Sequence, residues 1–265
     1  PDVSVITNIN YAHAKNFKKI KDIALAKAEI IHNTKSDGFV VLNADDIFYS
    51  LHRKIALKKK LRVVTFGIKS KKSDVKLIDI KKRNSFYKIR IRIQNAEKTF
   101  LLSNNFQSNI CNCLASIAVM SIYIDILNLN ENIFLNFLVP NGRGNLSKIK
   151  VDNKNFNLID ESYNSNPLSL KSAILNFDKL ELKKSKKYLL IGDMLELGRH
   201  SKKLHESIVP VINKTKINRV FVKGNMAINI FNKLQKSKKG RILYNKNQII
   251  KLIKNDLNNN DYLMM

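Results

Sequence analysis

The stretch KYLLIGDMLELG, residues 187–198, is an apolar run that ends abruptly in glycine and acidic residues. A short apolar run bounded by such residues is typical of a strand that is buried on both faces of a parallel sheet. Ligands of open α/β sheets bind beyond the carboxyl ends of the strands. Gly192, Asp193 and Glu196 are therefore candidate site residues.

The same alternation of strand and helix extends on both sides of this stretch. Five strands alternating with four helices predict a small doubly wound, Rossmann-like sheet. The predicted strands lie near 156–159, 187–192, 219–224, 241–244 and 261–265, and the predicted helices cover 167–180, 201–213, 226–234 and 246–257.

The first half of the chain also begins with strand, helix and strand, at 3–8, 20–31 and 39–43, which predicts a parallel crossover unit. Asn43 to Asp46 offer side-chain oxygens for the N-cap of the next helix. A strand at 62–67 and an antiparallel addition to the sheet follow, because apolar and charged residues alternate over 86–93. The other predicted elements are strands at 75–80 and 98–102 and helices at 109–127 and 130–138.

A polar, aperiodic segment separates the two halves. NGRGN, residues 141–145, contains two glycines and no apolar residue. Such composition is typical of a linker between domains. We predict one domain over 1–144 and a second over 145–265.

The formal charge of +27 raises the question of a nucleic-acid partner. Lysine runs at 58–60, 183–187 and 236–239 accompany asparagine and isoleucine rather than arginine-aromatic clusters. We interpret them as solvated surface and expect no specific nucleic-acid partner.

Cysteine usage and hydropathy predict the compartment. Cys111 and Cys113 match neither a disulfide framework nor a zinc spacing, which fits a reducing environment. No long apolar run and no signal-peptide pattern occur. We therefore expect a cytoplasmic protein that does not insert into membranes.

The richest candidate site is LIDESYNSNP, residues 158–167, where a predicted strand ends in acids and amides before a proline. A capped loop with Asn166 as the N-cap explains the same residues about equally well. A second candidate combines Thr7, Asn8 and His13 with Lys27, which lies in a helix rich in alanine. Taken alone, a loop histidine and a snorkelling lysine are the simpler interpretation there.

Seven strings, in this order and spacing, resemble the central and C-terminal domains of the Mur ligase family. They are SVITNINYAHAKNF, ALAKAEI, VVLNADD, NICNCLASIAV, GRG, LIDESYNSNP and IGDMLELG. The resemblance implies a P-loop-type central domain followed by a Rossmann-like C-terminal α/β domain. DESYNSNP and GDMLELG resemble the family member that adds D-alanyl-D-alanine to UDP-N-acetylmuramoyl-tripeptide, which is expected to act as a monomer when complete.

The resemblance implies that ATP phosphorylates a peptide carboxylate and that an amine attacks the acyl phosphate. Catalytic roles fall on Lys27, His13 and Arg143. Lys27 would be carbamylated and, together with His13, would hold Mg²⁺. Carbamylation needs a neutral amine, so we expect Lys27 to lie in a partly buried helix.

The resemblance assigns further residues to ATP and to the amine substrate. Asn8, Asn109 and Asn112 would contact the nucleotide, with the last two near adenine. Arg143 would approach the phosphates and Asp160 the ribose. The implied substrate-binding residues are Tyr163, Asn164, Asn166, Asp193 and Glu196.

The phosphate loop of the family, G-x-x-G-K-[ST], does not occur in the 265 residues. We therefore expect a piece of a longer ligase, in which parts present in relatives lie upstream and downstream. We also predict that this chain alone has no ligase activity and binds ATP weakly. The alternatives are a non-catalytic binding or scaffold remnant and another Mur ligase, such as the enzyme that adds the diamino acid.

Overall fold

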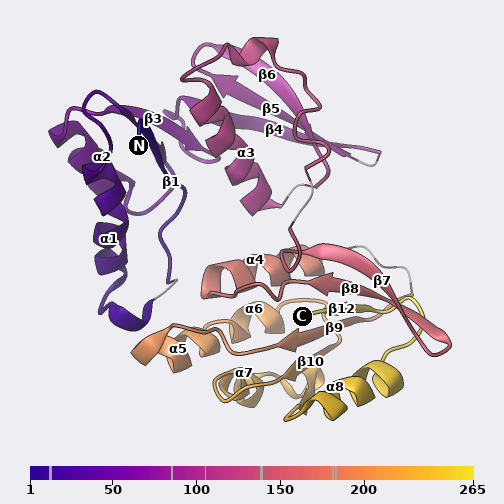
Figure 1. Ribbon diagram of the computed structural model, residues 1–265. Helices are drawn as coiled ribbons and strands as arrows, with labels where there is room; N and C mark the ends of the chain where they lie inside the picture. The colour runs from indigo at the N-terminus through magenta and orange to yellow at the C-terminus, as the bar shows by residue number, and fades with distance from the viewer. Residues whose placement is uncertain (12–13, 85, 105, 138–139, 181, 183) are drawn as a thin grey trace. The chain divides into compact units, whose positions relative to one another are not determined.

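The computed structural model describes residues 1–11, 14–84, 86–104, 106–137, 140–180, 182 and 184–265. The chain forms two compact units, each an α/β sandwich, as predicted (Figure 1). Unit 1 contains Pro1–Asn10 and Phe17–Leu138, and unit 2 contains Tyr11–Asn16 and Val139–Met265. The division falls six residues before the boundary that we predicted after residue 144, so the segment NGRGN lies in unit 2.

The sheet of unit 1 has six strands that lie in chain order. The strands β1 to β4 are parallel to one another, and β5 and β6 continue the sheet from β4 as an antiparallel meander, which confirms the predicted antiparallel addition. The strands are β1 (Val3–Ile6), β2 (Phe39–Asn43), β3 (Arg62–Gly67), β4 (Val75–Arg83), β5 (Phe86–Ile93) and β6 (Ala96–Leu102).

Helices cover both faces of this sheet. The helix α3 (Gln107–Met120) packs against β2, β3 and β4 in a cluster that includes Val41. Val40 and Leu42 point to the opposite face because side chains alternate along a strand, and both are fully buried. On that face α1 (Ile20–His32) and α2 (Tyr49–Lys58) contact each other and the parallel strands.

One helix predicted in unit 1 is shorter than expected, and a second predicted helix is absent over its described residues. The helix predicted over 109–127 ends at Met120, because the Asp125 side chain accepts a hydrogen bond from Leu127 N and begins a separate 3-10 turn, Ile126–Asn128. The segment predicted as a helix at 130–138 forms turns over its described residues. There the Asn130 side chain accepts a hydrogen bond from Asn132 N.

The sheet of unit 2 also has six strands. Five are parallel, and β7 pairs antiparallel with β8 in a hairpin that was not predicted. Its turn residue Asp152 adopts a φ of 51°, which suits a tight hairpin. The order is β11 (Lys239–Ile242), β10 (Arg219–Val222), β9 (Lys187–Ile191), β12 (Tyr262–Met264), β8 (Lys154–Asp160) and β7 (Asn145–Val151).

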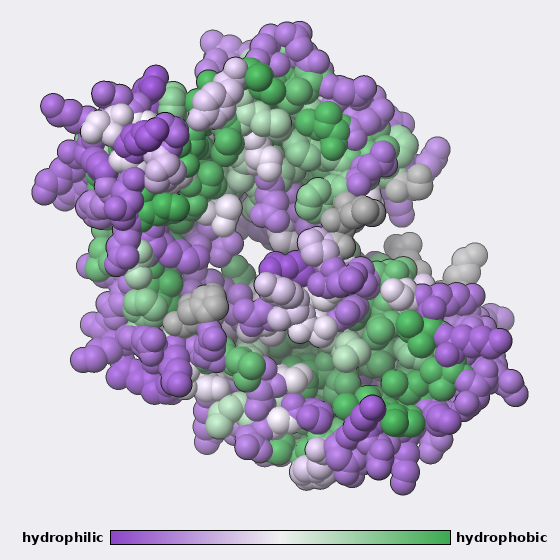
Figure 2. Space-filling model, viewed as in Figure 1, coloured by the Kyte–Doolittle hydropathy of each residue, from purple (hydrophilic) through white to green (hydrophobic). Residues whose placement is uncertain are grey.

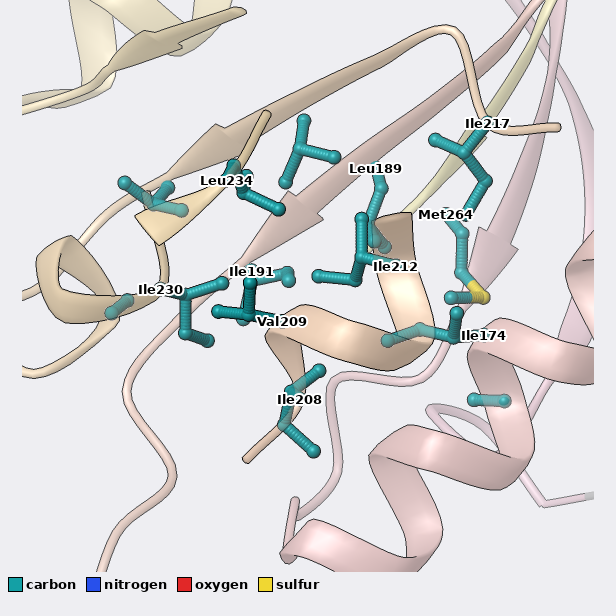
Figure 3. Close-up of a cluster of buried hydrophobic side chains, with 14 of the residues drawn as sticks. Ile174, Leu189, Ile191, Ile208, Val209, Ile212, Ile217, Ile230, Leu234 and Met264 are labelled. Carbon is teal, nitrogen blue, oxygen red and sulfur yellow. The ribbon is translucent and has the colours of Figure 1, made fainter. Parts of the chain in front are cut away.

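One face of this sheet packs against the helices α4 (Pro167–Asp178), α6 (Val209–Asn213) and α7 (Ala227–Lys233). Figure 3 shows their aliphatic side chains meeting those of the central strands. The other face packs against α8 (Lys246–Lys251) and the following turn, Leu252–Asp256. The helix predicted over 201–213 is divided into α5 (Ser201–Glu206) and α6. Pro210, in the first turn of α6, has no N–H to continue the hydrogen-bond ladder.

Hydrophilic residues are spread over the visible surface rather than gathered in one stripe (Figure 2). This distribution fits the interpretation of the lysine runs as solvated surface. Within the described ranges, no helix combines the length and the apolar character that crossing a membrane requires.

Candidate functional site

A hollow of about 490 Å³ lies at the carboxyl edge of the sheet of unit 2. Residues that follow β8, β12, β9 and β10 line it, because these four strands are parallel and end at the same edge. The polar lining residues are Glu161, Ser162, Tyr163, Asn164, Ser165, Ser169, Asp193 and Lys223.

The loop after β8 is held against the segment NGRGN. The Gly144 N–H donates to the Asp160 carbonyl (2.7 Å), and the Tyr163 N–H donates to the Gly142 carbonyl (3.1 Å). Gly142 has a φ of 76°, and a Cβ there would lie 2.8 Å from the Tyr163 nitrogen, so this contact requires glycine. The Arg143 guanidinium therefore lies 4.3 Å above the centre of the Tyr163 ring.

Glu161 lies beside this stacked pair and lines the hollow. Burial raises the pKa of its carboxyl group, and the neighbouring Asp160 charge raises it further, while the Arg143 charge partly opposes them. A carboxylate in this place lacks enough solvation or positive charge to balance it. It is therefore suited to facing a cationic group of a ligand.

The two asparagines of the loop have different roles. The Asn166 side chain accepts hydrogen bonds from Leu168 N and Ser169 N, both at 3.0 Å, and caps α4, so the capped-loop interpretation is confirmed for this residue. Pro167 occupies the first helical position, as predicted. Asn164 lines the hollow and is exposed.

Asp193 links β9 to the start of α7. Its Oδ1 accepts hydrogen bonds from Met226 N (3.0 Å) and Ala227 N (2.7 Å). The carboxylate occupies the space that a Cβ on Gly224 would take, so glycine is needed there. Asp193 thus has a structural role in addition to facing the hollow.

A buried histidine that the sequence analysis did not single out holds the loop after β9. The Nε2 of His205 accepts a hydrogen bond from Met194 N (2.9 Å), and its Nδ1 lies 2.8 Å from the Ser201 carbonyl. This pair of contacts requires the neutral tautomer with the proton on Nδ1. His205 lies 11 residues after Met194 in the sequence, and no sequence pattern predicts a contact over that separation.

The hollow thus brings together Tyr163, Asn164 and Asp193 from the predicted substrate set. Asn166 and Glu196 are not among its lining residues, and Glu196 is exposed with a φ of 59°. Glu161 lies in the candidate segment 158–167 but was given no role, and Lys223 was missed, although both directly follow a strand. The strand-end rule that selected Asp193 would also have selected them.

In unit 1, Lys27 projects from α1 toward the end of β1. Its Nζ donates to the Asn8 carbonyl at 3.0 Å. The helix α1 is partly buried, as expected, but the Lys27 side chain itself is exposed and reaches the edge of the sheet rather than the core. His13 lies outside the described residues, among which no group of three metal-ligating side chains occurs.

Two acidic residues join the strand ends of unit 1. Asp45 accepts hydrogen bonds from three successive backbone amides after β3, those of Ile68, Lys69 and Ser70. Asp46 accepts one from Ile9 N after β1 (2.8 Å). The predicted N-cap role was therefore wrong, since α2 begins at Tyr49 without a side-chain cap and these carboxylates hold neighbouring loops instead.

A small cavity of about 120 Å³ in unit 1 is lined by Asn109 and Asn112, with Phe134 and Phe137. Asn109 donates to the Asn104 side chain (2.9 Å), which fixes the start of α3. The cavity is smaller than the roughly 300 Å³ of common ligand pockets, so it suits one ring system rather than a whole nucleotide.

The comparison with known proteins agrees with the motifs in both units. The family model for the Mur ligase middle domain matches residues 1–120, and the model for the Mur ligase, glutamate ligase domain matches residues 146–265. The chain belongs to the Mur ligase family. This membership confirms the resemblance that the seven strings indicated.

Among relatives within the family, a UDP-N-acetylmuramoyl-tripeptide--D-alanyl-D-alanine ligase from Buchnera aphidicola is 32% identical over 259 residues, which covers 98% of this chain and 54% of the relative. The enzyme of that name from Bacillus subtilis is 32% identical over 226 residues, which covers 85% of this chain and 47% of the relative. The chain thus spans about half the length of these relatives.

Two solved structures show the same fold. MurF from Acinetobacter baumannii has a TM-score of 0.82 and 21% identity, with coverage of 100% of this chain and 56% of that chain. MurF from Thermotoga maritima in complex with ADP has a TM-score of 0.79 and 23% identity, with coverage of 100% and 58%. The Mur ligase fold is therefore present over the whole of this chain.

Proposed function

We propose that this chain is part of a cytoplasmic Mur ligase that uses ATP to join D-alanyl-D-alanine to UDP-N-acetylmuramoyl-tripeptide. One observation carries the proposal: the loops of DESYNSNP and GDMLELG line the same hollow in unit 2. The relatives from Buchnera aphidicola and Bacillus subtilis carry the name of this reaction.

The proposed reaction forms an acyl phosphate on the peptide and then an amide bond. The γ-phosphoryl group of ATP moves to the peptide carboxylate and ADP leaves. The neutral amine of the dipeptide then attacks the acyl carbon, displaces phosphate and loses a proton as the amide forms. The hollow of unit 2 would hold the dipeptide through Tyr163 and Asn164 and orient its amine. Arg143 would engage the transferring phosphoryl group, because its guanidinium is exposed and held over the Tyr163 ring.

The family resemblance assigns nucleotide-binding roles to residues within each unit. Asn109 and Asn112 line a cavity of the size of one ring system and would hold the adenine. Asn8 would contact the nucleotide from the end of β1, and Asp160 would accept hydrogen bonds from the ribose. Asp160 accepts one from Ser162 N at 3.0 Å, which fixes the orientation of its carboxylate.

Hard cations such as Mg²⁺ need several oxygen ligands. Among the described residues no group of three ligating side chains occurs, so a magnesium ion would fit near Lys27 only if the lysine carried a carbamate. The Lys27 Nζ lies 3.0 Å from the Asn8 carbonyl, at the end of β1. The carbamate and His13 would then hold the ion, which would neutralise charge on the phosphates.

The phosphate loop is absent from these 265 residues, so the backbone amides and the lysine that cradle phosphates in P-loop enzymes have no counterpart here. We expect no turnover of the tripeptide nucleotide by this chain alone. Turnover by the purified chain would contradict this expectation. A non-catalytic binding role of the same hollow is the second candidate, and it predicts dipeptide binding as well.

The test is direct binding of D-alanyl-D-alanine to the 265-residue chain, followed by amide NMR. We expect shifts at residues 161–165, 192–193 and 223–224, with weaker binding of L-alanyl-L-alanine. The variant Asn164→Ala should weaken binding, while Asn232→Ala, an exposed asparagine outside the hollow, should not. No shifts at millimolar dipeptide, or shifts spread evenly over the surface, would refute the substrate assignment.

A further inference from the structure

Lys223 is the one cation among the described residues that line the hollow of unit 2. It directly follows β10, and its backbone N–H donates to the Ile191 carbonyl (2.9 Å), which fixes the start of the side chain. Its ammonium group has no hydrogen-bond or ion-pair partner among the residues that the structure describes. A positive charge is therefore available at the β10 side of the hollow.

Glu161 provides the opposite charge at the β8 side. Its carboxylate accepts no hydrogen bond from the described residues, and burial disfavours its ionised form. The other acid of the lining, Asp193, is instead balanced by two amides at the start of α7. The hollow thus has a free acid at one end and a free cation at the other.

The spacing of the strands matches a dipeptide between these two groups. From β8 to β10 the order is β8, β12, β9 and β10, which is three steps of roughly 4.8 Å, or about 14 Å in total. An extended dipeptide spans about 7 Å. The remaining distance of about 7 Å is within the combined reach of a glutamate and a lysine side chain, whereas a single amino acid would leave a wider gap.

The wall between the two ends suits two methyl groups. It contains Ala173, Ile191 and Met264, all buried, together with the exposed Leu195. A ligand with charged ends and small apolar side chains would place each part against a matching surface.

We propose that Lys223 binds the carboxylate of the incoming dipeptide while Glu161 faces its amine, so that Lys223 selects a dipeptide with a free C-terminus. This inference rests on the function proposed above. The orientation places the amine on the side of Arg143, which is stacked next to Glu161. The nucleophile would thus lie on the side where we place the phosphoryl chemistry.

The experiment compares two ligands by calorimetry: D-alanyl-D-alanine and D-alanyl-D-alaninamide, which lacks the carboxylate. The unaltered chain should bind the dipeptide about 10- to 100-fold more tightly than the amide. Lys223→Met should lower the affinity for the dipeptide to that for the amide, and it should leave the affinity for the amide unchanged. Lys214→Met, an exposed lysine of unit 2 outside the hollow, is the matched control and should change neither affinity.

Unchanged binding of the amide also shows that Lys223→Met is folded. Glu161→Gln should weaken both ligands by a similar factor, because both carry the amine. If the dipeptide binds but Lys223→Met affects both ligands equally, or neither, the assignment of Lys223 is overturned and the proposed function stands. If the unaltered chain does not bind the dipeptide, both are overturned.

Discussion

Replacing Asp193 with alanine should destabilise unit 2 by about 2 kcal/mol, because the side chain caps α7 from a neighbouring strand end. Asp193→Ala removes the acceptor of the Met226 and Ala227 amides. Ala227 is fully buried, so its amide would lose a 2.7 Å hydrogen bond without gaining water, while Met226 is 37% exposed and can be hydrated. The Ala227 amide accounts for most of the expected loss.

The matched variants separate the cap from the charge. Asp193→Asn keeps an oxygen acceptor and should lower the free energy of unfolding by less than about 1 kcal/mol. It removes the same negative charge as Asp193→Ala does. Lys254→Ala removes one partner of an exposed ion pair with Asp152 and should cost no more than about 0.5 kcal/mol.

The assay is thermal unfolding combined with hydrogen exchange of the α7 amides. For a unit of this size, a loss of about 2 kcal/mol lowers Tm by roughly 8 °C. The amides of Met226 and Ala227 should exchange faster in Asp193→Ala and nearly normally in Asp193→Asn. If Asp193→Ala leaves Tm and the exchange of these two amides unchanged, Asp193 does not stabilise α7 as a cap.

Three further predictions concern burial and titration. The pKa of Glu161 is raised in the folded chain, so ionisation of this carboxyl group lowers stability as the pH rises above the usual glutamate range. Glu161→Gln should therefore have a higher Tm than the unaltered chain at pH 7 but not at pH 4. Burial raises the pKa of Cys111 to about 11 and of Cys113 to about 12, so both thiols should resist iodoacetamide at pH 7.5 until the chain is unfolded, and early labelling would contradict this. Ile212→Ala should lower the free energy of unfolding by about 2–5 kcal/mol in chemical denaturation, because the side chain is fully buried in the cluster of Figure 3, and a loss below about 1 kcal/mol would contradict that packing.

The sequence predicted best the elements whose signal is local. Buried parallel strands such as 187–191 are short apolar runs with polar ends, and they were found near their observed positions. The hairpin strand β7 was missed because its residues alternate between half-buried and exposed and include no long apolar run. The break between α5 and α6 was not predicted, because Pro210 is its only sequence signal within an otherwise helical pattern.

Site prediction followed the same division. Rules on strand ends selected Tyr163, Asn164 and Asp193, which the structure brings to one hollow. They did not reveal that Asp45 and Asp46 hold the loops after β3 and β1, since the Ile68 and Ile9 amides lie 23 and 37 residues away in the chain. At such separations sequence spacing carries no information.

The contrast between Asp193 and Glu161 indicates how one sheet edge supports both structure and binding. A carboxylate that accepts two backbone amides at a helix start is stabilised as an anion by the protein itself, and it has less to gain from a ligand. Glu161 accepts no hydrogen bond from the residues that the structure describes, and burial and Asp160 disfavour its anionic form. An ammonium group would relieve that cost, and Lys223 offers the same opportunity to a carboxylate across the hollow. The groups that the fold leaves unbalanced are therefore those that give a zwitterionic ligand its direction.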